Sequence, residues 1–396
     1  MGTTKQVRLS EIAELITKGT TPTTLGFDFQ DEGINFLKIE CFSENGSFMK
    51  DKVAHISEEC YEKLKRSQLE VGDILFSIAG AIGRVAMVTE EMLPANTNQA
   101  LSIIRIKRKD IYLPYIKLVL TSPFIKTQFE RKKQGVAQLN ISLKDISELT
   151  IPFPEIDKQR EYVTIFDCVL RITSACQQRL QKLDELVKSR FVEMFGDPII
   201  NEKKWATKKL DKACIAIVDC PHSTPNYTSE NTGYMCIRTS IVKKNRIMWE
   251  KIEYIKEDEY YTRIRRKRPG KGDIIYTREG AILGIAAVID RECNVALGQR
   301  SMLLSPDKKQ CTSEFLSVAM NCDSFLSNAL KGQSGSASPH INVGDIKDFQ
   351  MIMPPISQQR QFSAFVAEVD KSKLAVKQSL EKLETLKKSL MQQYFE

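Results

Sequence analysis

Short apolar segments bounded by Gly, Asn or Pro recur along the chain and predict β-strands. They cover residues 34–40, 74–78, 84–88, 101–106 and 151–154 in the first half, and 235–239, 274–277, 285–289, 301–304 and 353–355 in the second. Two longer segments, 112–133 and 312–331, predict helices. Strands and helices do not alternate regularly, which argues against a parallel dinucleotide-binding sheet and favours a mixed α/β (α+β) fold.

Each half ends in a longer polar segment that predicts a helix of roughly 39 residues, or about 58 Å. Both segments run without Pro or Gly, from the expected caps Asp157 and Ser357 to Phe195 and Phe395. Gly196, followed two residues later by a proline, is a typical end for the first helix. These lengths exceed those of ordinary globular helices, although a core helix packed on its own domain remains the alternative.

Apolar residues recur every seven positions on both long segments, and this spacing predicts a coiled coil. The predicted seam consists of Phe166, Val169, Cys176, Leu180, Leu183, Val187, Val366, Val369, Val376, Leu380, Leu383 and Leu390. Thr173, Lys373 and Lys387 interrupt it, so we expect a loose helix pair that leaves surface for other helices.

The sequence contains an internal repeat with a shift of 200 residues. The segment from Gly72 to Phe76 returns at 272–276, and Gln99 returns as Gln299. The same shift relates further positions, among them Ile141, Asp145, Pro154, Gln159 and Arg160 to Ile341, Asp345, Pro354, Gln359 and Arg360. The part before residue 72 matches only with slippage, so we expect two copies of one frame that contact different things.

The length of 396 residues fits two domains plus connecting elements. Hydrophobic residues make up 42% and charged residues 27%, as in an ordinary globular protein. No apolar segment approaches the roughly 18 residues that cross a bilayer, and residues 1–11 do not resemble a signal peptide. We therefore expect a cytoplasmic protein without a membrane partner.

Ten cysteines and three histidines could suggest a metal site, but no two cysteines form a CxxC pair. Reduced thiols that serve as small core residues are the simpler interpretation. We expect no metal.

The net charge of +8 lies entirely in the second half, because residues 199–396 hold 31 Lys/Arg against 23 Asp/Glu, whereas residues 1–198 hold 27 of each. A basic excess of this size is compatible with nucleic acid, acidic partners or a solvated surface.

Motifs for catalysis are absent from the sequence. It has no GxxxxGK[ST] phosphate loop, no GxGxxG motif and no GxSxG nucleophile elbow. The segment Asp219-Cys220-Pro221-His222 departs at two places from the Asn/Asp-Pro-Pro-aromatic motif of adenine methyltransferases. We therefore expect no catalytic centre and no enzyme activity on this chain.

Together, the repeat and its motifs resemble the specificity subunit of type I restriction-modification enzymes. The resemblance rests on the Gly-Asp-Ile-Leu/Ile strand with its glycine turn, the Pro-x-x-x-x-Gln-Arg entry at Pro154 and Pro354, and the Phe195-Gly196-Asp197-Pro198 exit. It covers essentially the whole chain.

The resemblance implies two pseudo-twofold-related target-recognition domains, separated by two long antiparallel coiled-coil helices that act as a ruler. The implied division is residues 1–155, recognition domain 1; 156–196, central helix; 197–355, recognition domain 2; and 356–396, C-terminal helix. Each domain would read one half of a split double-stranded DNA site.

The partners implied by the resemblance are two methyltransferase subunits and motor-nuclease subunits. S-adenosylmethionine, ATP and Mg are expected on those partners, and no cofactor is expected on this chain.

Base readout needs side chains that present paired donors or acceptors, such as Arg, Asn and Gln. In the first domain the candidates are Lys18, Thr20, Thr21, Lys38, Arg84, Asn98, Gln99, Gln138 and Asn140. In the second they are His222, Thr224, Arg238, Thr239, Arg278, Glu279, Gln299, Arg300, Ser336 and His340. For each of them a turn or solvated surface residue is the alternative.

Basic clusters recur at one place in both repeats and are candidates for phosphate contacts, with a solvated surface as the alternative. They are Lys63, Lys65, Arg66, Arg263, Arg265, Arg266, Lys267 and Arg268. Gly72, Asp73, Gly272 and Asp273 are expected to be structural, since they open a strand in each copy.

Two other functional classes remain open. A coiled-coil structural adaptor without its own DNA readout would bind protein and no DNA. A fused enzyme would transfer a methyl group to DNA as a single chain.

Overall fold

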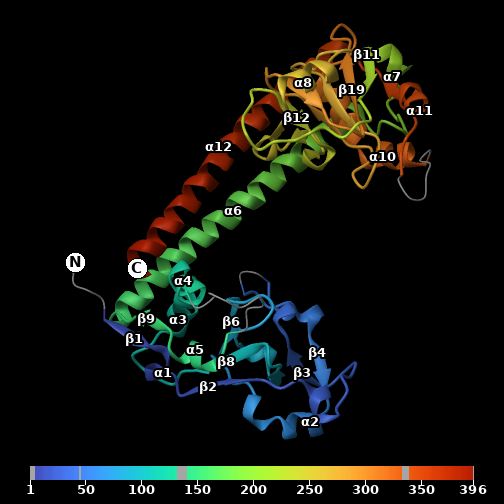
Figure 1. Ribbon diagram of the computed structural model, residues 1–396. Coiled ribbons are helices and arrows are strands. Elements are labelled where there is room, and N and C mark those ends of the chain that lie inside the picture. The colour runs from blue at the N-terminus through green and yellow to red at the C-terminus, as the bar shows by residue number, and fades with distance from the viewer. Residues whose placement is uncertain (1–4, 44–45, 132–140, 332–338, 396) are drawn as a thin grey trace. The chain divides into compact units, whose positions relative to one another are not determined.

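A computed structural model describes residues 5–43, 46–131, 141–331 and 339–395 of the chain, which divides into two compact units (Figure 1). The first unit is residues 1–175 together with 379–396, and the second is residues 176–378. Each long helix therefore contributes one end to each unit.

The first unit contains short strands and helices in mixed order (Figure 1). Its strands are β1 Gln6–Arg8, β2 Leu15–Lys18, β3 Ile34–Leu37, β4 Ala54–Ile56, β5 Ile74–Ser77, β6 Val85–Met87, β7 Ala95–Thr97, β8 Leu101–Arg105 and β9 Thr150–Pro152. Its helices are α1 Leu9–Ile12, α2 Glu58–Lys63, α3 Leu113–Leu120, α4 Pro123–Arg131 and α5 Leu143–Ser147, with 3-10 turns at η1 Pro22–Leu25, η2 Ile39–Cys41, η3 Lys50–Lys52, η4 Lys65–Ser67 and η5 Glu90–Met92.

The second unit follows the same order. Its strands are β10 Thr207–Lys209, β11 Cys214–Asp219, β12 Met235–Ile237, β13 Val242–Lys243, β14 Arg246–Ile247, β15 Glu253–Tyr254, β16 Ile274–Thr277, β17 Ala286–Val288, β18 Val295–Leu297, β19 Ser301–Pro306 and β20 Gln350–Ile352. Its helices are α7 Leu210–Ala213, α8 Glu257–Arg263, α9 Ser313–Asn321, α10 Asp323–Leu330 and α11 Val343–Asp348, with 3-10 turns at η6 Thr239–Ile241 and η7 Trp249–Lys251.

Sheet topology is repeated in the two units. The four-stranded antiparallel sheet β2-β8-β5-β6 corresponds to β11-β19-β16-β17, and the three-stranded sheet β4-β3-β7 corresponds to β15-β12-β18. In both three-stranded sheets the middle strand pairs parallel with β7 or β18. The sequence repeat is thus a repeat of the fold, and the hairpin β13-β14 of the second unit has no counterpart among the described strands of the first.

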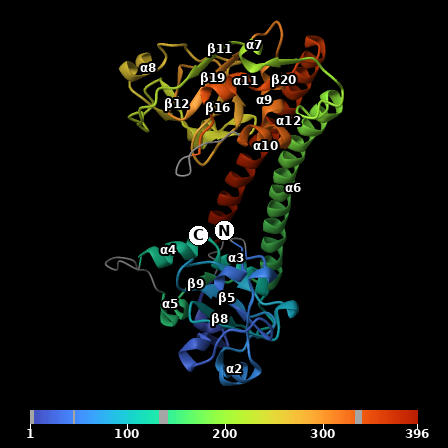
Figure 2. The same ribbon diagram turned by 90° about the vertical axis from the view of Figure 1, so that its right-hand side faces the viewer.

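Alternating side chains of the four-stranded sheet enter different cores, as the two-residue period of a strand requires. Ile74 and Phe76 of β5 pack in the core that contains α3, α4 and the long-helix ends, whereas Leu75 packs on the opposite side with Leu37 and Phe42. The same alternation holds in β16, where Ile274 and Tyr276 pack in one core and Ile275 packs in the other. Figure 2 shows β16 beside β19, its neighbour in the four-stranded sheet. The sheet therefore joins the helical layer to the smaller sheet within each unit.

Nine of the ten predicted strands are confirmed to within a few residues at each end. The tenth, expected at 353–355, is wrong in position: the strand there is β20, Gln350–Ile352, and Pro354 and Pro355 have no N–H to donate to a neighbouring strand. The helices predicted over 112–133 and 312–331 are each wrong in one respect, because each range contains two helices. Pro123 begins α4, and a proline cannot continue the helix before it. Cys322, between α9 and α10, has an extended backbone with φ −61° and ψ 141°.

The long helices are α6, Ile156–Phe195, and α12, Ile356–Phe395, each of 40 residues (Figure 1). Both helices begin one residue before Asp157 and Ser357. The prediction that these two residues cap the helices was therefore wrong, because they lie in the first turn. Both end at the predicted phenylalanines, and Gly196 adopts the left-handed φ of 77° that ends a helix.

Within each unit the ends of α6 and α12 pack antiparallel. In the first unit Tyr162 stacks on Tyr394 with ring centroids 4.1 Å apart, and Phe166 stacks on Phe395 at 5.9 Å. In the second unit Phe195 contacts Phe362 at 5.6 Å, while Lys373 pairs with Asp184 nearer the middle of both helices. Every residue of the predicted seam is buried or half-buried, as a helix pair requires.

Candidate nucleic-acid interface

In the first unit, polar side chains converge where β2, β3 and β7 end. β3 and β7 run parallel with Leu37 paired to Thr97, so Lys38 and Asn98 emerge at the same edge. The chain leaving β2 crosses this edge closely, because Thr20 N donates to Thr97 O at 3.2 Å. Gly19 is required there, since a Cβ would lie 1.8 Å from the same oxygen. We call Lys18, Thr20, Thr21, Lys38, Asn98 and Gln99 the first edge.

The corresponding edge of the second unit is built in the same way. Ile237 pairs parallel with Leu297, and Gly298 N donates to Ile237 O at 2.9 Å. Cys220, just after β11, donates its N–H to Ser301 O. We call His222, Thr224, Arg238, Gln299 and Arg300 the second edge.

One hydrogen bond recurs at both edges. The Thr21 hydroxyl bonds the Gln99 amide oxygen, and the Thr224 hydroxyl bonds that of Gln299 at 3.0 Å. Because each bond uses the amide oxygen of the glutamine, its amide N–H₂ group remains as a pair of donors at each edge.

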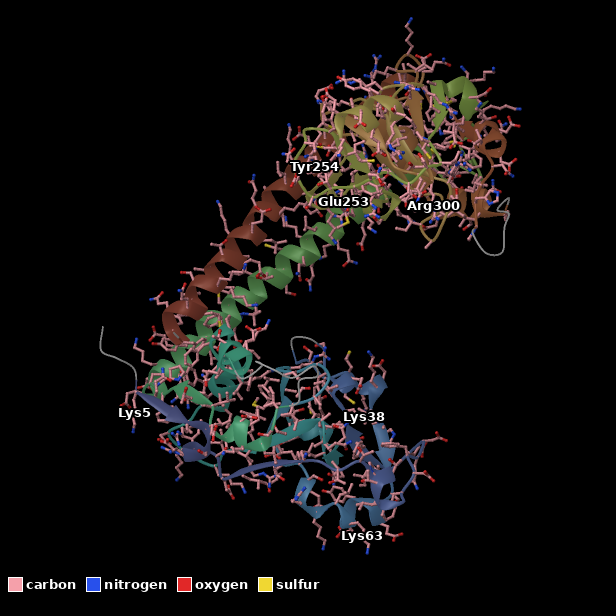
Figure 3. All side chains as sticks on the ribbon, viewed as in Figure 1. Lys5, Lys38, Lys63, Glu253, Tyr254 and Arg300 are labelled. Atoms are coloured by element: carbon pink, nitrogen blue, oxygen red, sulfur yellow. The ribbon has the colours of Figure 1, made fainter. Side chains whose placement is uncertain are left out.

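A cation rests on an aromatic ring at the end of the central strand in each unit. Lys38 Nζ lies 4.0 Å from the Phe29 ring centroid, and the Arg238 guanidinium lies 4.3 Å from that of Tyr227. Arg238 also donates to Glu253 at 2.6 Å, a bond that raises the pKa of the guanidinium above its ordinary value. Figure 3 labels Lys38 on the first unit and Glu253 and Arg300 on the second.

Asp219 organises the second edge from the end of β11. Its carboxylate accepts from Arg278 Nε at 2.9 Å and lies 3.1 Å from His222 Nε2. The sheet register places Lys18 and Asp219 at equivalent ends of β2 and β11, so the two edges differ in the sign of this charge.

Three arginines predicted to contact DNA have their guanidinium groups in structural contacts, and we leave them out of the candidate interface. Arg84 donates to Ile39 O and Phe42 O, and Arg278 is buried against Asp219. Arg263 has a side chain 2% exposed, which donates to Glu259, Leu297 O and Ser223. The buried guanidinium groups of Arg263 and Arg278 have no free face for a base or phosphate, and the half-buried Arg84 directs Nη1 to the two carbonyls.

The remaining predicted base readers fall into three groups. Asn98 accepts from Ala100 N through its side chain and so shapes the turn, and Thr239 begins a 3-10 turn after Arg238. Glu279 lies 3.7 Å from Arg300 Nε and forms a backbone bridge with His340. Gln138, Asn140 and Ser336 lie outside the described residues.

The predicted phosphate-contacting residues are mostly exposed, and Lys63 lies well apart from Lys38 (Figure 3). Lys65 pairs with Glu62 at 3.5 Å while 75% of its side chain stays exposed. In the second unit, Lys267 pairs with Asp273 and is largely covered. The exposed members there are Arg265, Arg266 and Arg268.

The motifs kept in both repeats turn out to build the frame. Gln159 and Gln359 are fully buried and bond backbone groups on two neighbouring segments. Asp73 accepts from Glu70 N and from Arg105, and Asp273 accepts from Gly270 N. The structural role expected for these aspartates agrees with these bonds.

The cysteines occupy mostly core positions, and seven of the ten are buried. Burial raises the pKa of the Cys214 and Cys236 thiols to about 12, so both stay protonated at neutral pH. Across the part of the chain that the structure describes, no three His, Cys, Asp or Glu side chains form a group that could hold a metal, and no helix is long and apolar enough to cross a membrane.

Sequence reasoning missed Phe29, Tyr227 and Glu253, which hold the cations Lys38 and Arg238, and Asp219, which holds Arg278 and contacts His222. Phe29 and Tyr227 lie in the divergent segments before the central strand, and the number of residues that separates Phe29 from Thr21 differs from the number that separates Tyr227 from Thr224. No fixed spacing marks them, so only the folded chain brings each ring to its cation.

A known family matches the chain in two places. The type I restriction modification DNA specificity domain matches residues 1–185 and again residues 202–386. The two matched ranges correspond to the two copies of the internal repeat.

Among known proteins, the chain is 30% identical over 176 residues to the type I restriction enzyme EcoBI specificity subunit of Escherichia coli. That similarity covers 43% of this chain and 36% of the relative, so the chain aligns with little more than a third of it.

Solved structures share the fold along the whole chain. One, from work on complex assembly and conformational transition of the type I R-M system, covers 100% of this chain and 98% of its own, with a TM-score of 0.64 at 17% identity. Another, a type I restriction-modification system S subunit from M. genitalium, covers 99% of this chain and 96% of its own, with a TM-score of 0.52 at 13% identity.

Proposed function

This chain belongs to the type I restriction-modification DNA specificity family, and from that premise we propose that it reads a bipartite double-stranded DNA site. Residues 1–155 and 197–355 would each read one half-site, joined by the helical segments 156–196 and 356–396. The observation that carries the proposal is the pair of edges, equivalent in topology and different in side chains.

Each edge carries exposed donors on rigid strand ends, which is the arrangement that direct readout of base edges requires. The shared Thr–Gln bond would supply a common element, because both copies keep it. The different side chains at these equivalent ends, an exposed Lys18 in the first unit and an Asp219 paired with Arg278 in the second, would make the two half-sites unlike.

The candidate base-contacting residues are the exposed and half-buried members of the two edges. The candidate phosphate contacts are Lys63, Lys65, Arg66, Arg265, Arg266 and Arg268. Phosphate contacts position a protein on the duplex, and base contacts then specify the sequence.

The family description names DNA specificity and no catalytic activity. We propose that the chain is non-catalytic and that partner subunits supply the chemistry. Methyltransferase subunits would bring S-adenosylmethionine, and motor-nuclease subunits would bring ATP and Mg.

Exposed leucines on the long helices support docking of two copies of one partner. Leu186 and Leu386 are each 47% exposed and lie 200 residues apart, at equivalent positions of the repeat. Equivalent apolar positions on α6 and α12 fit two identical subunits, here two methyltransferase subunits, better than one.

The long helices would set the distance between the half-sites. A helix of 40 residues is about 60 Å long, which corresponds to roughly 18 base pairs at 3.4 Å each. A pseudo-twofold relation between two similar domains would suit half-sites on one face of the duplex.

Exchange of residues 1–155 for those of another specificity subunit tests the proposal. Long-read mapping of methylated adenines in cells that carry the chain and its methyltransferase partner should show one half of the motif changed and the other retained. A change in both halves, or in neither, would rule out two independent readers.

A salt-dependent gel shift with random duplex, with and without the methyltransferase partner, tests the adaptor alternative. DNA binding in either case supports the proposal, whereas no binding in both supports an adaptor without DNA readout. Methyl transfer by the purified single chain would contradict the non-catalytic assignment.

A further inference from the structure

We propose that Arg238 reads a guanine in the half-site bound by the second unit, and that Tyr227 and Glu253 position its guanidinium for that contact. The inference rests on the proposed function and adds one base identity and two positioning residues to it.

The backbone places Arg238 at a rigid exit from the sheet. It follows Ile237, the last residue of β12, whose carbonyl accepts from Gly298 N across the parallel strand. The side chain is 46% exposed, so its free donors can meet a ligand at the second edge. A residue at the end of a paired strand has less backbone freedom than one within a loop, which favours precise contact with a base.

The Tyr227 ring fixes the plane of the guanidinium. Its centroid lies 4.3 Å from the guanidinium carbon, within the range of a cation–π contact. The ring itself is held against the sheet, because a Cβ at Gly298 would lie 2.6 Å from the tyrosine hydroxyl. Burial raises the pKa of Tyr227, which keeps the hydroxyl neutral beside Arg238.

Glu253 fixes the rotation of the guanidinium within that plane. Arg238 Nη1 donates to Glu253 Oε2 at 2.6 Å, and Glu253 is anchored on β15, where it pairs with Cys236. Among the described residues the guanidinium has no other hydrogen-bond partner. Nε and Nη2 therefore remain as two parallel donors, the pair that O6 and N7 of guanine accept in the major groove.

The first unit has no acidic residue at the position of Glu253, and comparison of the two units shows what Glu253 contributes. Lys38 rests on Phe29 in the same place, but Ala54 occupies the register position of Glu253, opposite the central strand. A lysine without an orienting acid presents a mobile point charge, whereas an oriented arginine presents a planar fork. We therefore assign the guanine contact to the second unit alone.

The direct test compares the chain with its Arg238→Ala variant, each assembled with the methyltransferase partner. Methylated-adenine mapping should show one G·C position of the second half-site become degenerate, with the first half-site unchanged. In competition binding with duplexes altered at single base pairs, discrimination at that position should fall by about 5- to 150-fold. Arg238→Lys should keep affinity while losing most of that discrimination.

Glu253→Ala and Tyr227→Leu test the positioning roles without removing the reading group. Both should lower discrimination at the same G·C position. Glu253→Ala should also raise affinity for random duplex, because it removes a negative charge beside DNA, and a merely structural loss would not do so. Tyr227→Phe keeps the ring and should retain the wild-type motif, while thermal unfolding shows whether each variant is folded.

Arg265→Ala is the matched control, since this exposed arginine is a candidate phosphate contact of the same unit. It should weaken binding to all duplexes alike and leave the motif intact. If folded Arg238→Ala behaves like Arg265→Ala, or relaxes an A·T position, the guanine assignment is overturned. If the unaltered chain yields no split motif at all, the proposed function itself is wrong.

Discussion

At the scale of single residues, two buried glutamines fasten the long helices to their units. The Gln359 amide oxygen accepts from Thr312 N, and its amide nitrogen donates to Gln310 O and Pro354 O. Gln159 makes the same three bonds in the first unit, to Tyr112 N and to Asp110 O and Pro154 O. The glutamine of the Gln-Arg motif therefore has a structural role, because it supplies hydrogen bonds to backbone groups that water cannot reach.

Gln359→Leu should destabilise the second unit, because it leaves three backbone groups without a partner at a fully buried site. Each such group costs about 1–3 kcal/mol, so we expect a loss of at least about 2 kcal/mol in the free energy of unfolding. Urea unfolding of the variant measures it. Gln361→Leu, at an exposed position of the same helix, should change stability little, and equal losses in both variants would contradict the argument.

Arg300 at the second edge has a left-handed backbone with φ 71°, which side chains rarely adopt. Arg300→Gly should raise the free energy of unfolding by about 1 kcal/mol, because glycine adopts this conformation without strain. The same change should weaken DNA binding, since it removes an exposed cation. Thermal unfolding and a gel shift measure the two effects.

Arg246→Gly is the control, and it should change the free energy of unfolding in the opposite direction. Arg246 lies in β14, where glycine lowers stability and has no backbone strain to relieve. A loss of stability in Arg300→Gly would show that its backbone conformation is not a source of strain.

At the scale of elements, Asp323 joins three segments of the second unit. It begins α10 and accepts from Lys188 of α6 at 2.6 Å and from Lys244, just after β13, at 2.9 Å. These two lysines lower the pKa of the carboxyl to about 2. The site is 67% exposed, so solvent screening keeps its contribution to stability modest.

Acid should therefore weaken this junction. Because the folded-state pKa is lowered, the contribution is complete above the unfolded value near 3.9 and is lost as the pH falls from about 4 toward 2. Asp323→Asn should lower the thermal midpoint slightly at pH 7. The midpoint of this variant should then decline less steeply than that of the unaltered chain as the pH falls from about 4 toward 2. Parallel melting curves of both proteins from pH 7 to pH 2 measure it, and identical slopes would contradict the assignment.

At the scale of the whole molecule, the second half of the chain has more Lys and Arg than Asp and Glu, and several of these basic residues lie together in the segment 263–268. Arg265, Arg266 and Arg268 are exposed, whereas Arg263 and Lys267 of the same segment are covered. The sequence alone marked all five as equal candidates. Burial separates those that can reach a phosphate from those that cannot.

Replacing Arg265, Arg266 and Arg268 with Gln should reduce the salt dependence of DNA binding. Each phosphate contact contributes about 0.9 to the slope of log affinity against log salt, so the slope should shrink by about 2 to 3. Binding titrations between low and moderate salt measure it. The same charge change at Lys377, Lys382 and Lys388 of α12 should leave the slope nearly unchanged, and equal effects would indicate non-specific attraction.

Much of the frame was predictable from particular residues. Gly72-Asp73 and its repeat marked a strand in each unit, and the heptad positions of Val187 and Val369 marked buried helix faces. Pro123 and Cys322, in contrast, each divided a helix that was predicted as one. The candidate interface was predicted only in part, since Thr21, Lys38 and Gln99 converge but Arg84 is occupied by carbonyls of η2 and the residue after it.

The sequence by itself determined the repeat, the long helices and some of the strands, because periodicity and glycine spacing act through the local backbone. Strands β2, β7, β11 and β18, which build the two edges, were not predicted. Only the tertiary structure decided which cations are available and which are held. Arg278 meets Asp219 from 59 residues away, and Arg238 finds its acid across a neighbouring strand. Such pairings depend on strand register, and side chains that are equivalent in sequence can therefore differ in burial, partner and charge.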